Sequence, residues 1–138
     1  MAQFLRLLVQ VPPLLFALLF GAQGVLWLVN PQRASDFWGF ALPDGGMGLS
    51  SMIGAMAGWG LTIAVFLIVA LIRRERVWYY PPILIFLSLA LGRIVAGLAH
   101  GAPHLPERYI PEIVFAGLLF LASRYATKAR PDATSQIQ

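Results

Sequence analysis

The chain has 138 residues, of which 59% are hydrophobic and only 12% are charged, and its mean hydropathy is +0.74. Soluble domains carry about 25% charged residues, so this composition excludes an ordinary soluble domain and indicates a membrane protein. The net charge of +4 does not indicate nucleic-acid binding, because the basic residues stand beside apolar segments, where such residues orient helices. The chain has no cysteine, which excludes disulfides and thiolate metal sites.

The first apolar segment covers residues 7–32, which carry no charge. This length is sufficient to cross a hydrocarbon core of about 30 Å, and we expect a membrane span at 8–30. Pro12 and Pro13 are expected in the first helical turn, where a missing N–H is tolerated. A cleaved signal peptide with Arg6 in its basic region is the alternative, but the apolar sequence continues well past the length of such a peptide's core.

The second and third apolar segments are separated by a basic cluster. Residues 45–72 are uncharged and are followed at once by Arg73-Arg74-Glu75-Arg76, which predicts a second span at 47–72 with a basic stop after it. The aromatic residues Trp78, Tyr79 and Tyr80 then begin a third span, which is predicted at 78–99. This third span contains one charged residue, Arg93.

The fourth apolar segment is the shortest. We expect a span at 109–127, although its uncharged core covers only residues 113–123, between Glu112 and Arg124. The long stem of Arg124 can extend toward the interface and so lengthen the span. The alternative is a helix that lies on the membrane surface. Residues 129–138 form a polar cytoplasmic tail in this interpretation.

Together these segments predict an all-α integral membrane four-helix bundle in one domain, residues 1–128. Seven of the ten basic residues lie on one side of this arrangement: Arg6, Arg73, Arg74, Arg76, Arg124, Lys128 and Arg130. Basic residues are retained on the cytoplasmic side of a membrane. The sequence therefore predicts that both termini are cytoplasmic.

Arg93 is the residue that points most strongly to a polar site. It lies about 10 Å inside the membrane in the predicted third span, where a charge requires a partner. Glu112 is expected at a similar depth in the antiparallel fourth span, so that the two can form a charge-assisted pair. The pair either fixes the register of the two helices, or it belongs to a ligand site in which Arg93 receives an acidic head group and Glu112 holds Arg93 in place.

Small and polar residues at helical spacing are the candidates for lining a polar pocket around this pair. They are Gln23, Ser50, Ser51, Gly54, Gly58, Gly97 and His100. The spacing of Gly54 and Gly58 also suits close helix packing, either within the chain or in a homodimer. The four tryptophans are interpreted as anchors at the membrane interface.

No motif assigns a catalytic residue. His100, His104 and Glu107 are three potential metal ligands near one loop, but Pro103 and Gly101 interrupt a regular helix there and no fourth ligand is evident. We therefore predict no metal site, and the sequence leaves open whether the chain is an enzyme, although it favours a non-enzyme.

A resemblance to a known family rests on four stretches: Trp27-Leu28-Val29-Asn30-Pro31, residues 54–60, Leu91-Gly92-Arg93, and Glu112. On these residues the chain resembles small four-helix bacterial membrane proteins that are catalogued as a domain of unknown function, in the neighbourhood of the DoxX-like group. The resemblance implies a bacterial inner-membrane location and adds weight to the pair of Arg93 and Glu112. It brings no established activity. The DoxX-like group is connected with quinone-linked oxidation, but no cofactor-ligand pattern in these residues supports that connection. No cofactor is predicted, and a bound lipid or quinone is left open.

Three functions remain open at this stage. The first is a non-enzymatic membrane protein that binds a lipid or other lipophile, or that serves as an accessory subunit of a membrane complex. The second is a small transporter or proton-coupled permease, which would have to dimerise because four helices leave little room for alternating access. The third is a membrane enzyme that uses the His and Glu side chains of the loop at 100–107.

Overall fold

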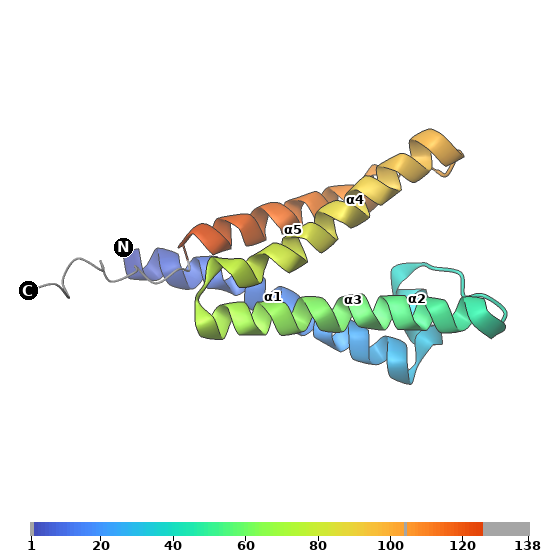
Figure 1. Cartoon of the computed structure of the whole chain (residues 1–138), viewed down its shortest axis with the longest axis horizontal. Coiled ribbons are helices and arrows are strands. Elements are labelled where there is room, and N and C mark those ends of the chain that lie inside the picture. The colour runs from blue at the N-terminus through green and yellow to red at the C-terminus, as the bar shows by residue number, and fades with distance from the viewer. Residues whose placement is uncertain (1, 104, 126–138) are drawn as a thin grey trace, which may run out of the picture.

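The structure is a computed structural model that describes residues 2–103 and 105–125. Within these residues it is entirely helical, with no strand. The elements in chain order are α1 (Ala2–Val29), α2 (Pro31–Trp38), α3 (Gly46–Arg73), the short 3₁₀ helix η1 (Arg76–Tyr79), α4 (Tyr80–His100) and α5 (Pro106–Tyr125) (Figure 1). The predicted all-α class is confirmed.

Three helical stretches are long and apolar enough to cross a membrane: Leu8–Val29, Gly46–Arg73 and Arg76–His100. The fourth expected span falls on α5, which forms a helix of 20 residues but is not among the three, because charged residues interrupt its apolar sequence at both ends. The end of that predicted span at residue 127 and the predicted tail lie outside the described residues.

The short helix α2 is defined by its capping residues. The Asn30 side chain accepts a hydrogen bond from the Arg33 N–H at 3.0 Å, and Pro31 occupies the first turn, where its missing N–H costs nothing. Gly39 ends the helix in the left-handed conformation at a φ of 67°. The chain therefore turns directly from α1 into a separate short helix.

Pro12 and Pro13 are not in the first turn of a helix, as the sequence suggested, but inside α1, which begins at Ala2. Apolar surroundings explain this difference. Proline is tolerated within helices that cross a membrane, because leaving the helix there would expose backbone groups that have no water to pair with.

The helices are arranged as two hairpins. α1 packs most extensively against α3, and α4 packs against α5. The two hairpins lie together near η1 and diverge toward the end that carries α2 (Figure 1). Contacts between α3 and α4 are much less extensive than those within either hairpin, although the two helices are joined directly through η1.

Two glycines set the crossing of α1 and α3. A Cβ atom at Gly60 would lie 2.6 Å from the Phe20 carbonyl oxygen and 2.9 Å from the Gly24 Cα atom, and one at Gly24 would lie 2.8 Å from the Leu61 N atom. The backbones therefore touch, and any larger residue would force them apart.

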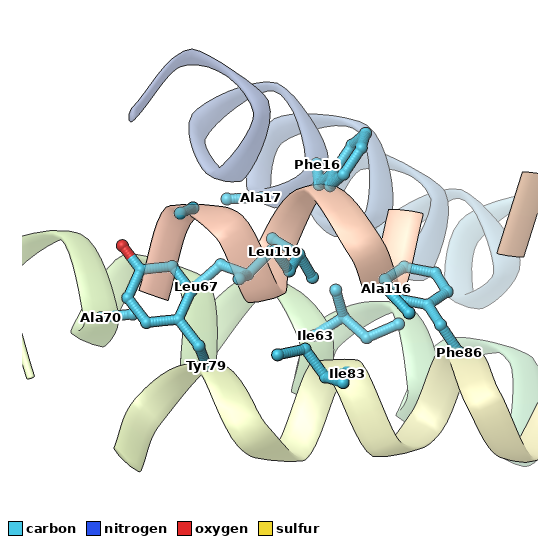
Figure 2. Close-up of a cluster of buried hydrophobic side chains, with 11 residues drawn as sticks. Phe16, Ala17, Ile63, Leu67, Ala70, Tyr79, Ile83, Phe86, Ala116 and Leu119 are labelled. Atoms are coloured by element: carbon cyan, nitrogen blue, oxygen red, sulfur yellow. The ribbon is translucent and has the colours of Figure 1, made fainter. Parts of the chain in front are cut away.

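The main hydrophobic core lies at the η1 end and takes side chains from all four long helices and η1 (Figure 2). Its buried members are Phe16, Ala17, Ile63, Leu67, Ala70, Tyr79, Ile83, Phe86, Ala116, Leu119 and Ala122. A second cluster, formed by Trp27, Ala34 and Ala57, joins only α1, α2 and α3. The α4–α5 hairpin is therefore attached to the rest of the chain mainly at one end.

Candidate ligand-binding site

Arg93 and Glu112 form an ion pair between α4 and α5. The Arg93 Nε atom donates a hydrogen bond to Glu112 Oε1 at 2.9 Å. The side chain of Glu112 is 11% exposed, whereas that of Arg93 is 36% exposed. The carboxylate is thus buried, and the guanidinium lies partly open beside it.

Both residues of the pair have hydrogen-bonding atoms that the pair does not use. Glu112 Oε2 is buried and has no hydrogen-bond partner. A guanidinium has five N–H donors, and in the part of the chain that the structure describes Arg93 makes only the one hydrogen bond from Nε. An acceptor and several donors therefore remain side by side.

Arg93 and Glu112 both line a cavity of about 260 Å³ between the two hairpins, which we call the central cavity. Side chains from α1, α2, α3, α4 and α5 line it, and most of them are apolar or aromatic. Its position follows from the fold, because the hairpins diverge beyond the core at the η1 end. The central cavity is small, but its mixture of apolar walls and a few polar groups is typical of ligand pockets.

An aromatic layer separates the central cavity from the core. The ring centroid of Phe86 lies 5.1 Å from that of Phe20 and 5.5 Å from that of Phe115, in edge-on arrangements. Phe16 continues the layer into the core, with its centroid 4.5 Å from that of Phe115. Edge-on packing of this kind is stabilising, so that these rings form a well-packed floor of the cavity.

Gln23 supplies a second unpaired acceptor. It is 7% exposed, lines the central cavity from α1, and its Oε1 atom has no hydrogen-bond partner. Its neighbour Gly24 lies at the helix crossing with α3, so that the backbone beside Gln23 packs directly against α3. Burying an amide without a partner is costly, which makes this residue unusual for a purely structural position.

The lining of the central cavity contains two more charged residues, Glu107 and Arg108, both on the first turn of α5. Arg108 Nη1 donates a hydrogen bond to the Trp38 carbonyl oxygen at 2.7 Å, which connects the start of α5 with the end of α2. The four charged residues of the lining are thus two arginines and two glutamates.

A second, larger space of about 590 Å³ lies between α3 and α4, and we call it the lateral groove. Leu84, Ser88 and Gly92 of α4 lie on one side of it. It shares part of its lining with the central cavity, namely Phe40, Met56, Trp59, Leu89 and Arg93. The two spaces therefore meet at Arg93.

The structure brings together three of the residues proposed from the sequence, Arg93, Glu112 and Gln23. The other proposed lining residues are absent from the linings of both described spaces: Ser50, Ser51, Gly54, Gly58, Gly97 and His100. For the four of these residues that lie on α3, the reason is the rotation of this helix, which turns Gly60 toward α1. A Cβ atom at Gly54 or Gly58 would meet nothing within 4 Å.

Aromatic residues of the site were not identified from the sequence. Trp38 and Trp59 line the central cavity, and Trp27 is only 2% exposed, whereas the sequence predicts that all three are anchors at the membrane interface. Phe20 and Phe115 were not singled out at all. A helical projection would have placed Phe16, Phe20 and Gln23 on one face of α1, but nothing in the sequence indicates that this face meets α5.

The suggested metal cluster cannot be assembled from the described residues. His104 lies outside them, His100 is exposed at the end of α4, and Glu107 faces the central cavity. Among the side chains that the structure does describe, no three His, Cys, Asp or Glu residues form a group that could hold a metal ion.

The fold and the cavity together define a class of protein: a small all-helical chain with three helices able to cross a membrane and a polar site between two hairpins. More specifically, residues 8–123 match the family described as Domain of unknown function (DUF4345), and the chain belongs to that family. No curated protein and no solved structure matches this chain. The relation to the DoxX-like group stays a prediction.

Proposed function

We propose that this chain is a non-enzymatic membrane protein that binds a lipid-like amphiphile in the central cavity. The observation that carries the proposal is a pair of buried acceptors without partners, Gln23 Oε1 and Glu112 Oε2, on two residues that line one mostly apolar cavity from two different hairpins. Each unpaired buried polar atom costs about 1–3 kcal/mol, and a bound polar group would recover that cost.

A purely structural role for the ion pair accounts for less of the geometry. A pair that only fixed the register of α4 and α5 would need neither an adjoining cavity nor Gln23 on α1. The partial exposure of Arg93, with unused donors beside the cavity, also favours a group that arrives from outside. These features support binding, whereas no group in the lining is arranged as a nucleophile with its base.

We place the protein in the bacterial inner membrane with four spans and both termini cytoplasmic. α5 packs along α4 and directs its most buried charge at Arg93, which supports a fourth span in spite of its charged residues. Arg76 Nη2 donates a hydrogen bond to the Arg124 carbonyl oxygen at 3.4 Å, so that two basic segments lie at the same end. The excess of basic residues at that end supports a cytoplasmic position.

The test is native mass spectrometry of the full-length protein, gently extracted, together with the variant Arg93→Met/Glu112→Leu. Replacing both partners leaves no unpaired charge, so that the variant should fold. We expect a lipid-like molecule to be retained by the unmodified protein and lost from the double variant. Arg124→Met is the matched control, because this arginine contacts the Phe120 ring at the opposite end, at 5.3 Å from its centroid.

Retention of the same molecule by a well-folded double variant would contradict the proposal. So would an unmodified protein that carries no such molecule and takes none up when lipids are added back. Circular dichroism of each variant establishes that the helices are intact.

A dimeric transporter is the second candidate, and one observation favours it. The face of α3 that carries Gly54 and Gly58 is open to its surroundings, and such a face suits close packing with a second helix. Because the chain has no cysteine, a single Ser51→Cys substitution would report this contact by disulfide formation in the membrane. A chain that stays monomeric under oxidising conditions would count against a transporter.

A further inference from the structure

The geometry points to the chemical class of the bound molecule, an inference that rests on the proposed function. We infer that it is a neutral amphiphile whose head group donates a hydrogen bond in the central cavity and whose apolar chain lies in the lateral groove. A long-chain alcohol is the simplest member of this class. The inference differs from the acidic head group that Arg93 by itself suggested.

The charges of the lining argue against an acidic head group. Arg93 is already paired with Glu112, and the other two charged residues, Arg108 and Glu107, also have opposite signs, so that the formal charges of the lining cancel. An anion beside Arg93 would lie next to the Glu112 carboxylate, and like charges at such a distance in an apolar site repel strongly.

The unpaired acceptors of the lining favour a bound molecule whose head group donates a hydrogen bond. An ionised carboxylate oxygen accepts hydrogen bonds and cannot donate them, so that Glu112 Oε2 requires an N–H or O–H group. Gln23 Oε1 is a second acceptor in the same cavity. A hydroxyl group can donate to one of these atoms and also accept from the free N–H groups of Arg93, whereas an ionised fatty acid offers no donor at all.

The lateral groove provides the place for the chain of the amphiphile. It meets the central cavity at Trp59, Leu89 and Arg93, so that a head group held by Arg93 directs its attached chain between α3 and α4. Leu84 and Trp59 are 62% and 41% exposed on the groove, which places its mouth on the outer surface of the helices. A molecule from the surrounding lipid can therefore reach the site without passing through water.

The experiment compares two probes that share a chain and differ in the head group, dibrominated stearyl alcohol and dibrominated stearic acid. Both are added to the full-length protein in phosphatidylcholine nanodiscs at alkaline pH, because the bilayer raises the pKa of the fatty acid and the acid must be ionised for the comparison. The quenching of tryptophan fluorescence by bromine is then followed. We expect saturable quenching by the alcohol at a concentration at least about ten-fold lower than by the acid, which corresponds to 1.4 kcal/mol. Equal or tighter binding of the acid would overturn the neutral head group and leave the proposed function standing.

The position of the amphiphile's apolar chain is tested by replacing the tryptophan that reports the quenching. Trp59 lines both spaces, whereas Trp78 lies in η1 and lines neither. Trp59→Phe should remove most of the quenching by the alcohol, and Trp78→Phe should retain it. The opposite pattern would overturn the placement of the chain in the lateral groove.

A pair of matched variants tests the head group. Gln23→Leu should weaken binding of the alcohol several-fold, while Gln10→Leu, the same change on the same helix outside both linings, should not. Equal binding by Gln23→Leu would overturn the role of Gln23 as an acceptor. If quenching by both probes stays non-saturable, or is unchanged in Arg93→Met/Glu112→Leu, the proposed function itself fails together with this inference.

Discussion

The two ends of this molecule are built on different principles. At the η1 end, all four long helices share one core, in which Leu67, Tyr79 and Leu119 are fully buried. At the α2 end, the second cluster binds α2 to α1 and α3 but takes no buried residue from α4 or α5, and the central cavity lies between the hairpins. At the η1 end the core cluster is apolar except for the Tyr79 hydroxyl, which is buried without a hydrogen-bond partner, whereas several charged and polar side chains interrupt the packing at the α2 end.

The comparison distinguishes residues that stabilise the fold from residues that form the candidate site. Residues at the η1 end should determine whether the chain folds, because they hold the hairpins together. Residues around the central cavity should contribute little to folding, because some of their polar atoms lack partners in the protein itself. Unsatisfied groups at functional sites are the expected cost of keeping a site ready for its ligand.

The largest effect is expected in the core. Leu119→Ala should lower the free energy of unfolding by about 2–5 kcal/mol, because a fully buried side chain is lost and a cavity remains. Leu89→Ala, at the α2 end, should cost clearly less, since Leu89 is only half-buried and already borders open space. Unfolding of both variants in a detergent titration measures the difference, and equal losses would remove the distinction between the two ends.

The crossing of α1 and α3 should give the next largest effect. Gly60→Ala should destabilise the protein by about 1–3 kcal/mol, because the new Cβ atom would lie 2.6 Å from the backbone of α1. Gly58→Ala is the control two residues earlier on α3. Nothing would contact its Cβ atom, and the change should be neutral or stabilising by up to about 1 kcal/mol, as is usual for glycine in a helix.

The ion pair should behave non-additively. Arg93→Met alone should cost about 1–2 kcal/mol, because it leaves the buried Glu112 carboxylate without its partner, and the partial exposure of Arg93 moderates this loss. Arg93→Met/Glu112→Leu should recover most of the stability. A double variant that is less stable than the single one would mean that the pair holds the hairpin together.

The smallest effect on stability is expected at Gln23, and its sign is informative. Gln23→Leu should leave the stability of the ligand-free protein unchanged or raise it by up to about 1 kcal/mol, because an unpaired buried amide is replaced by an apolar group of similar size. A thermal unfolding series of delipidated protein checks this. A clear loss of stability would show that Gln23 is structural.

Some of this architecture follows from the sequence. The apolar segments predict the three helices that can cross a membrane, since length and composition are sufficient for that inference. The proximity of Arg93 and Glu112 follows from depth alone, because a short connection makes the last two helices antiparallel. Both inferences depend on distances along the helix axis.

Rotation about the helix axis could not be predicted. Which glycine faces α1, Gly60 or the pair Gly54 and Gly58, is decided by backbone contact with Gly24 and not by any local pattern. The burial of Trp27 against α2 and the meeting of Gln23 with α5 residues around one cavity have the same origin. Apolar helices carry a weak periodic signal, so that their facing sides emerge only when the whole bundle is assembled.

Attachment of the hairpins at one end also has a mechanical consequence. α3 has 28 residues and is about 42 Å long, so that it acts as a lever arm with its pivot near η1. A slight rotation about that pivot changes the separation of the hairpins most at the α2 end, where the Arg108–Trp38 hydrogen bond connects them. Lateral pressure from the bilayer would therefore change the volume of the cavity long before it disturbed the core.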